Sequence, residues 1–295
     1  MTEYLAEHGT AVEAALERAL ERLAPGVTTE SLAAMRHGLM GGGKRLRPIL
    51  CVSAYRACGG ALSEAVYDLS ASLEMIHGYS LMHDDLPCMD DADLRRGRPT
   101  THREHGEVTT VLAGTQLIPA AAIQALTACR ALGCPEERAR TVAIELMQAA
   151  GAGGMVGGQW LDLLGEGHIL GADELDALHR RKTGALLAAS LVMGAVAADA
   201  EGDVRDALQA YGRAIGLAFQ IADDVLDATA SAEVLGKNPS DAELDKSTYV
   251  ALYGLDEARV RAKEQVRQAL DALAIAGVDA PALEALAHYV VERDK

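Results

Sequence analysis

The segment from His83 to Arg98 holds the residues of this sequence whose types and spacing best suit chemistry. It contains five aspartates within ten residues, and three arginines within four residues follow them. Carboxylates this close repel one another, so a cation is expected among them, and hard oxygen ligands with room for water suit Mg²⁺. The arginines suit phosphate oxygens, which they bind through bidentate hydrogen bonds. The segment indicates a diphosphate site, and a solvated charged loop is the alternative that this segment alone leaves open.

A second acidic cluster lies on one face of a helix predicted between residues 211 and 229. Gln220, Asp223, Asp224 and Asp227 fall at i, i+3, i+4 and i+7, so they share that face. The rest of the segment is apolar enough for a core, where unpaired charges are not tolerated. A surface helix with an acidic stripe is the alternative, but the apolar residues leave little room for solvent. The two acidic clusters are therefore predicted to form two walls of one site that holds several Mg²⁺ ions.

Both clusters resemble the aspartate-rich motifs of the short-chain trans-isoprenyl diphosphate synthases, the family of the farnesyl and geranylgeranyl diphosphate synthases. The first motif is matched by DDLPCMDDADLRRGRPT from residue 84, and the second by FQIADDVLD from residue 219. Five further blocks match in the family's order: GGKRLRP from residue 42, EMIH from 74, GGQ from 157, KTG from 182 and ERDK from 292. One motif alone would be weak evidence, but seven blocks in order cover nearly the whole chain.

The resemblance implies head-to-tail condensation of isopentenyl diphosphate with an allylic diphosphate (dimethylallyl or geranyl), with Mg²⁺, three ions per active site, as the cofactor. Breaking the allylic C–O bond leaves a delocalised carbocation and a diphosphate with new negative charge, which metal ions and fixed cations stabilise. The isopentenyl double bond then attacks the cation. The departing diphosphate takes the released proton, so no protein base is implied.

The same resemblance assigns roles to individual residues. The metal ligands are Asp84, Asp85, Asp90, Asp223, Asp224 and Asp227. The allylic diphosphate is held by Arg95, Lys182 and Lys237, and the cation is steadied by Gln220 and the carbonyl of Thr183. A second, metal-free diphosphate pocket is formed by Lys44, Arg47, His77 and Arg96. A terpene cyclase ionises one diphosphate and needs no second pocket, so the second basic set favours condensation. A non-catalytic partner subunit would lack one aspartate motif, and here both are complete.

Product length is predicted from the residues one helical turn before the first motif. Tyr79 and Ser80 stand five and four positions before Asp84, where side chains can form a floor below the aspartates. In the resembling family an aromatic residue there stops growth at farnesyl diphosphate, so Tyr79 favours that product. Geranylgeranyl diphosphate is the alternative, because the Pro87–Cys88 insert resembles some synthases of that product and Ser80 is small. Tyr79 as simple helix packing also stays open.

The composition favours an all-α protein. Hydrophobic residues make up 49% of the chain and aromatic residues 3%, and alanine-rich segments with few β-branched runs are typical of helices. Many helices joined by short turns indicate a single large helical bundle. The resemblance places a central cavity in it and implies one polyprenyl synthase domain over residues 1–295 that forms a homodimer.

The net charge of −16 argues against nucleic acid and anionic membranes as partners. The five cysteines are an odd number without metal-ligand spacing, which favours a reducing compartment. The N-terminal residues do not resemble a signal peptide, and no stretch reaches the roughly 18 apolar residues of a membrane span. The predicted location is the cytoplasm.

Periodicity and breaker residues predict where the helices lie. Helices are expected at residues 3–23, 28–40, 62–85, 106–132 with a kink at Pro119, 136–163, 173–198, 247–275 and 280–293. Asp85 and Asp90 do not fit one straight helical face, so a bulge or helix end at Pro87 must bring Asp90 back beside Asp84. An irregular flap is expected at residues 228–244. Thr115 departs from the family's aspartate, and the loop after Lys237 is one residue short.

Overall fold

The computed structural model describes residues 1–229 and 247–292 of the chain. The described part is helical except for one two-stranded hairpin, so the predicted all-α class is confirmed. The chain divides into two compact units. The N-terminal unit comprises Thr2–Val52 and Ala61–Ile144, and the C-terminal unit comprises Ser53–Gly60, the chain from Glu145 onward and Met1. The single domain over residues 1–295 stays a prediction.

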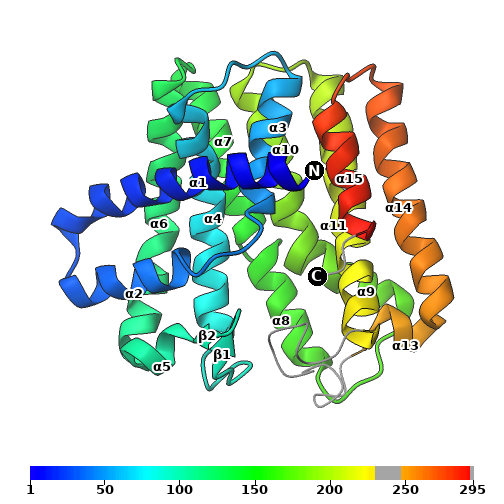
Figure 1. Ribbon diagram of the computed structural model, residues 1–295, viewed down its shortest axis with the longest axis horizontal. Coiled ribbons are helices and arrows are strands. Elements are labelled where there is room, and N and C mark those ends of the chain that lie inside the picture. Colours follow the sequence, from blue (N-terminus) through cyan, green and yellow to red (C-terminus); the bar gives the residue numbers. More distant parts are fainter. Residues whose placement is uncertain (230–246, 293–295) are drawn as a thin grey trace. The chain divides into compact units, whose positions relative to one another are not determined.

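The N-terminal unit packs around two long helices, α4 and α6, which lie side by side, with α1 across α4 and α2 against both (Figure 1). Its elements are α1 (Thr2–Leu23), η1 (Ala24–Gly26), α2 (Thr29–Leu39), the first part of α3 (Leu46–Ala57), α4 (Glu64–Asp84), β1 (Leu94–Arg95), β2 (Arg98–Pro99), α5 (Thr101–His105), α6 (Glu107–Ala131) and the first part of α7 (Glu136–Ala150).

Local sequence explains these helices. Val12, Leu16 and Leu20 recur at helical spacing along α1, and all three side chains are fully buried, as an amphipathic core-facing helix requires. The hydroxyl of Thr28 accepts from the N–H of Ser31 and so caps the N-terminus of α2. In α4, by contrast, every residue from Leu69 to Ile76 is buried, so this helix crosses the core of its unit.

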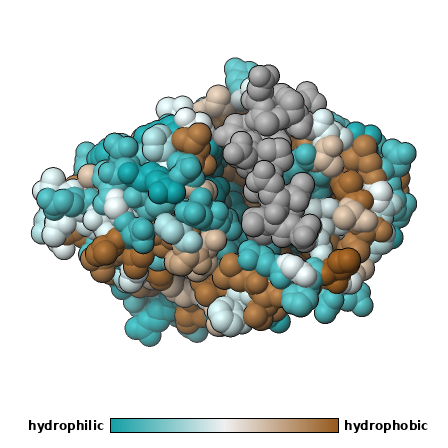
Figure 2. Space-filling view, turned by 90° about the horizontal axis from the view of Figure 1, so that it is seen from below, coloured by the Kyte–Doolittle hydropathy of each residue, from teal (hydrophilic) through white to brown (hydrophobic). Residues whose placement is uncertain are grey.

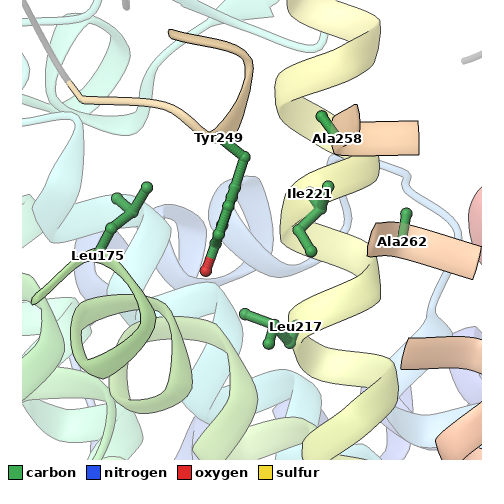
Figure 3. Close-up of a cluster of buried hydrophobic side chains, with 6 residues drawn as sticks. All are labelled: Leu175, Leu217, Ile221, Tyr249, Ala258 and Ala262. Atoms are coloured by element: carbon green, nitrogen blue, oxygen red, sulfur yellow. The ribbon is translucent and has the colours of Figure 1, made fainter. Parts of the chain in front are cut away.

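The C-terminal unit is built on α11, which packs against α10 on one side and α14 on another. Its elements are the remainders of α3 and α7, then α8 (Met155–Gly165), α9 (Ala172–His179), the π-helical turn η2 (Arg180–Gly184), α10 (Ala185–Ala197), α11 (Gly202–Thr229), α13 (Tyr249–Tyr253), α14 (Leu255–Ile275) and α15 (Pro281–Glu292). Figure 3 shows one buried cluster of this unit, in which Leu175, Tyr249 and Ala258 converge on Leu217 and Ile221 of α11.

Two predicted helices are interrupted, and the expected boundaries were wrong there. Residues 136–163 form α7 and α8 with a break at 151–154, where Gly154 has a non-helical backbone (φ −118°, ψ −128°); a Cβ on this residue would lie 2.1 Å from the carbonyl oxygen of Ala149. The helix predicted at 173–198 is confirmed as a continuous helical run from Ala172 to Ala197, which contains the π-helical turn η2 between α9 and α10. Residues 247–275 are split by Gly254, whose φ of +79° ends α13.

Helix α6 is, by length and composition, apolar enough to cross a membrane, and 44% of its most apolar window is buried. The core helix of a soluble protein passes the same test, so this is weak evidence for a span. The five cysteines are free thiols.

Candidate active site

The first aspartate motif begins where α4 ends. The backbone N–H of Asp90 donates to the carbonyl of Asp84 at 2.9 Å, and the N–H of Ala92 donates to the carbonyl of Asp85 at 3.2 Å. The chain therefore folds back on the last turn of α4 at Pro87. The predicted return of Asp90 to a position beside Asp84 is confirmed.

The side chain of Asp85 is buried and paired with an arginine. Its two oxygens accept from Nε and Nη2 of Arg95 at 2.6 to 2.8 Å, and only 3% of the residue is exposed. Burial alone would lower the pKa of Arg95, but the hydrogen bond and charge of Asp85, with Asp84 and Asp90 nearby, raise it above its ordinary value. Arg95 is thus a cation that Asp85 holds in place.

Arg96 leaves this cluster because it occupies a tight turn. Strands β1 and β2 pair Arg95 with Arg98, and the two residues between them, Arg96 and Gly97, both have positive φ, the conformation of a type I′ hairpin turn. The guanidinium of Arg96 donates to the carbonyl of Gly42. It also fills the space that a side chain on Gly43 would need. The hairpin therefore places Arg95 and Arg96 on different partners.

A buried ion pair fixes the turn that carries Lys44. Arg45 donates to Glu74 of α4 at 2.7 Å and to the carbonyl of Leu39 at 2.8 Å, and both charged side chains are almost fully buried. Arg45 also has a φ of +51°, a conformation that costs free energy and persists only where the surroundings hold it. The sequence motif drew attention to Lys44 and Arg47, but Arg45 is the residue that positions them.

His77 lies next to this second basic set. Burial, followed by the charges of Arg47 and Arg96, holds its pKa well below the ordinary value, so the imidazole is neutral at physiological pH. A neutral ring donates one hydrogen bond without adding charge. The N-terminal unit thus brings together three of the four residues predicted for the metal-free pocket, with Lys44 on the adjoining turn.

The C-terminal unit arranges the residues around its own aspartate motif. Lys182 of η2 donates to Asp162 of α8 at 2.5 Å. A side chain on Gly158 would lie 2.1 Å from the backbone nitrogen of Lys182, so this glycine permits the close approach of α8 to η2. The hydroxyl of Thr183 donates to the side-chain oxygen of Gln220 at 2.8 Å, which orients the Gln220 carbonyl.

Asp162, Lys182 and Gln220 share an open pocket of about 610 Å³, a volume that includes the solvent at its mouth. It is lined by Asp162, Gly165, Leu170, Leu175, Leu178, His179, Lys182, Gln220, Asp224, Ser247 and Thr248. Asp224 is buried, whereas Asp223 and Asp227 are partly exposed on the same helix. The predicted neighbours Lys182, Gln220 and Asp224 are therefore brought together in one pocket.

The carboxylates fit Mg²⁺ only as partial ligand sets. Among the residues that the structure describes, no group of three or more His, Cys, Asp or Glu side chains is placed to hold a metal ion by itself. Asp84 and Asp90 are adjacent through their backbones, and they offer hard oxygen atoms. Mg²⁺ is commonly bound by one or two carboxylates while waters and substrate phosphates complete its shell. The donor set therefore fits that ion together with a diphosphate.

The predicted chain-length residues lie in α4. Tyr79 is 6% exposed, and its ring packs edge-on against His83 at 5.6 Å between centroids. Burial, with the charge of Asp84, raises the pKa of Tyr79 to about 12, so the phenol stays protonated. Ser80 donates to the carbonyl of His77. Thr115, the departure from the family pattern, is exposed on α6 and its hydroxyl donates to the carbonyl of Val111.

Sequence reasoning gave no role to Arg45, Glu74, Asp162, Asp176 or Tyr249. In the sequence, Asp162 was marked only by its place three positions after Gln159. The other four residues have partners far away in the sequence, so no local pattern indicates their roles. The flap was predicted at 228–244, but Ala228 and Thr229 are the last residues of α11. The rest of the predicted flap, with Lys237, lies outside the described residues, as does the end of the chain from residue 293.

Comparison with known proteins gives consistent matches. A model of the polyprenyl synthetase family matches residues 29–279. The chain is 43% identical over 279 residues to farnesyl diphosphate synthase of Escherichia coli (strain K12), and 92% of each chain is covered. It is 42% identical over 294 residues to a chloroplastic geranylgeranyl pyrophosphate synthase of Catharanthus roseus, which covers 99% of this chain and 81% of that protein. A crystal structure of an FPP/GFPP synthase from Zymomonas mobilis matches with a TM-score of 0.80 at 34% identity, covering 97% of this chain and 99% of that one.

Proposed function

Because the chain belongs to the polyprenyl synthetase family and is a prenyltransferase, we propose that it condenses isopentenyl diphosphate with dimethylallyl or geranyl diphosphate and releases farnesyl diphosphate. The observation that carries this proposal is the divergence of Arg95 and Arg96. Arg95 is paired with Asp85 in the aspartate motif, whereas Arg96 contacts the turn that precedes Lys44. Two basic groups with different surroundings suit two diphosphates, one with metal ions and one without.

The allylic diphosphate is assigned to the acidic motifs. Asp84 and Asp90 of the N-terminal unit and Asp223 of the C-terminal unit are the residues that would hold Mg²⁺, which would supply charge to stabilise the leaving diphosphate. Arg95 is held by Asp85 and gives its remaining N–H groups to phosphate oxygens. To reach the same diphosphate, the ammonium of Lys182 breaks its hydrogen bond with Asp162 or keeps it and donates to both acceptors.

Cation stabilisation is assigned to oxygen atoms without full charge. The hydroxyl of Thr183 donates a hydrogen bond of 2.8 Å to the side-chain carbonyl of Gln220. The dipole of this carbonyl is therefore oriented before the reaction begins. The carbonyl of Thr183 belongs to the π-helical turn η2, where the regular backbone hydrogen-bond pattern of an α-helix is interrupted. Both oxygens are suited to face a carbocation without reacting with it.

Isopentenyl diphosphate is assigned to Lys44, Arg47, His77 and Arg96. The arginines supply charge, and the neutral ring of His77 supplies a hydrogen bond. A direct test incubates the protein with isopentenyl and geranyl diphosphates, with Mg²⁺ or with a chelator, and follows the consumption of both substrates. Consumption of both only in the presence of Mg²⁺ supports the proposal. Consumption of geranyl diphosphate alone would favour a cyclase.

Tyr79 is proposed to limit product length. Tyr79→Ala is expected to open space below the aspartates and to shift the main product from farnesyl to geranylgeranyl diphosphate, as measured by mass spectrometry of the extracted diphosphates. Tyr79→Phe keeps the ring and is the matched control, with the wild-type product expected. If the wild type already makes geranylgeranyl diphosphate and Tyr79→Ala changes nothing, Tyr79 is a packing residue and the floor lies elsewhere.

A homodimer is proposed from an apolar stripe on α6. Val108, Leu112 and Ile123 are 74%, 54% and 63% exposed, and they lie along one face of the helix with the exposed Thr115 and Pro119. Figure 2 shows hydrophobic residues lying among hydrophilic ones on the face of the molecule that is seen from below. Exposed apolar stripes of this length mark interfaces, and a second copy would bury it.

Leu112→Asp and Ile123→Asp are expected to convert the dimer to a monomer, because each places a charge in the buried centre of the interface. Sedimentation velocity measures the change. Val260→Asp, at a residue of α14 that is 60% exposed, is the matched control and should leave the sedimentation coefficient unchanged. A wild-type monomer with full activity at assay concentration would refute the dimer.

The cytoplasmic location and the absence of nucleic acid among the partners are likewise proposed from the charge and the free thiols.

A further inference from the structure

Tyr249, the first residue of α13, joins two carboxylates through two different donors. Its backbone N–H donates to Oδ2 of Asp224 at 2.7 Å, and its phenol donates to Oδ1 of Asp176 at 2.5 Å. Asp224 belongs to α11 and Asp176 belongs to α9. Tyr249 therefore links three helices of the C-terminal unit through two hydrogen bonds to charged acceptors, which are among the stronger kind in proteins.

The surroundings leave Tyr249 little freedom. The residue is 2% exposed, and Figure 3 shows its ring between Leu175 of α9 and the α11 side chains Leu217 and Ile221. The ring of His179 lies 5.6 Å away. Burial, and next the hydrogen bond and charge of Asp176, raise the pKa of Tyr249. The phenol is thus a donor at every pH at which the protein would be assayed.

The chain just before Tyr249 is held by further hydrogen bonds. Ser247 accepts from the N–H of Leu170 at 2.8 Å and donates to the carbonyl of His168 at 3.3 Å. The hydroxyl of Thr248 accepts from the N–H of Ala251 and caps α13. Ser247 and Thr248 line the same pocket as Asp162, Lys182 and Gln220. The position of Tyr249 therefore fixes one side of the pocket that surrounds the second aspartate motif.

Asp224 is the aspartate of the motif that is built into this network. It is 6% exposed, and a carboxylate that is buried to this degree requires hydrogen-bond donors. Asp223, one residue earlier, is partly exposed. The first motif also has one buried and one partly exposed aspartate. Asp85 is buried against Arg95, and Asp84 is partly exposed.

We propose that Tyr249 and Asp176 are positioning residues and that Asp224 anchors them to α11 instead of serving as a metal ligand. The network holds Ser247 and Thr248 at the pocket and keeps the acidic face of α11 in one orientation, so that Asp223 is presented to the diphosphate and its metal ions. This inference rests on the proposed function for the identity of that ligand.

The test compares variants by calorimetric titration with Mg²⁺ and inorganic pyrophosphate, and by kcat and KM for geranyl diphosphate. Tyr249→Phe removes the phenol donor but keeps the ring and the backbone N–H, and it is expected to weaken pyrophosphate binding and to lower kcat/KM about tenfold. The matched control is Tyr253→Phe, the same change in the same helix on the ring stacked beside Tyr249. It should alter neither quantity. Equal effects of the two substitutions would overturn the positioning role.

The role of Asp224 is tested by conservative rescue. Asp224→Asn keeps an oxygen that can accept from the N–H of Tyr249, whereas Asp224→Ala does not. Asp224→Asn is expected to lower the affinity for Mg²⁺ with pyrophosphate less than tenfold, Asp224→Ala much more, and Asp223→Asn at least a hundredfold. If Asp224→Asn loses as much affinity as Asp223→Asn, Asp224 is a metal ligand and the inference is wrong. A wild type that shows this binding pattern without prenyl transfer would instead contradict the proposed function and leave the network standing.

Discussion

Asp84→Asn and Asp223→Asn are each expected to lower kcat by about a thousandfold or more, while KM for isopentenyl diphosphate changes little. Each substitution replaces the carboxylate group by a neutral amide of nearly the same shape. Packing is therefore kept, and only the ability to hold a cation is lost. The negative charge that develops on the leaving diphosphate then lacks its strongest partner. Single-turnover assays with geranyl and isopentenyl diphosphates over a range of Mg²⁺ concentrations measure the loss.

Asp93→Asn is the control for this prediction. Asp93 lies in the same acidic segment, but its side chain is 74% exposed and it pairs with Arg103, so its replacement should leave kcat near the wild-type value. Higher Mg²⁺ should restore part of the activity of Asp84→Asn, because weaker binding is offset by mass action. If Asp84→Asn and Asp93→Asn behave alike, the first motif acts as a general acidic surface and does not hold specific metal ions.

Arg47→Ala is expected to raise KM for isopentenyl diphosphate roughly 30- to 100-fold and to reduce kcat only slightly. This increase in KM is the size expected for the loss of one hydrogen bond from a charged donor. The KM for the allylic substrate should stay near the wild-type value, because Arg95 and Lys182 are untouched. Steady-state kinetics with each substrate varied in turn separate the two constants. The control is Arg36→Ala, which removes an exposed arginine of α2 that pairs with Glu17 and should change neither KM.

His77→Ala should raise the same KM by a smaller factor than Arg47→Ala. The pKa of His77 is held low by burial and then by the charge of Arg47, so the neutral ring contributes one hydrogen bond and no charge. Because a lowered pKa extends the neutral range towards acid, the effect of His77→Ala should be constant from pH 7 upward. An unchanged KM for isopentenyl diphosphate in Arg47→Ala would show that the second pocket is wrongly assigned.

The family and the arrangement of the first motif could be predicted from sequence because both depend on local patterns. Seven blocks in order identified the family, which the match over residues 29–279 confirms. The spacing of Asp85 and Asp90 around Pro87 ruled out one straight helix, and the backbone hydrogen bond from Asp90 to Asp84 confirms the return.

Features set by packing between distant segments could not be predicted. The helix expected at 136–163 breaks at 151–154, where Gly154 has a non-helical backbone, and a run of small residues in the sequence fits a continuous helix equally well. The bond from Tyr249 to Asp176 spans 73 positions, and the pair of Arg45 with Glu74 spans 29. Neither of these two pairs produces a periodic pattern in the sequence. Asp85 is paired with Arg95, a partner ten residues away that the motif did not reveal, and its role as a metal ligand stays a prediction.

The central claim is that two diphosphates are joined, and the most direct test is the mass of the product. The protein is incubated with geranyl diphosphate, isotopically labelled isopentenyl diphosphate and Mg²⁺, and the products are analysed by mass spectrometry without phosphatase treatment. We expect a prenyl diphosphate one isoprene unit longer that carries the label, together with one equivalent of released pyrophosphate. An unlabelled hydrocarbon or alcohol, with the isopentenyl diphosphate left intact, would contradict the account.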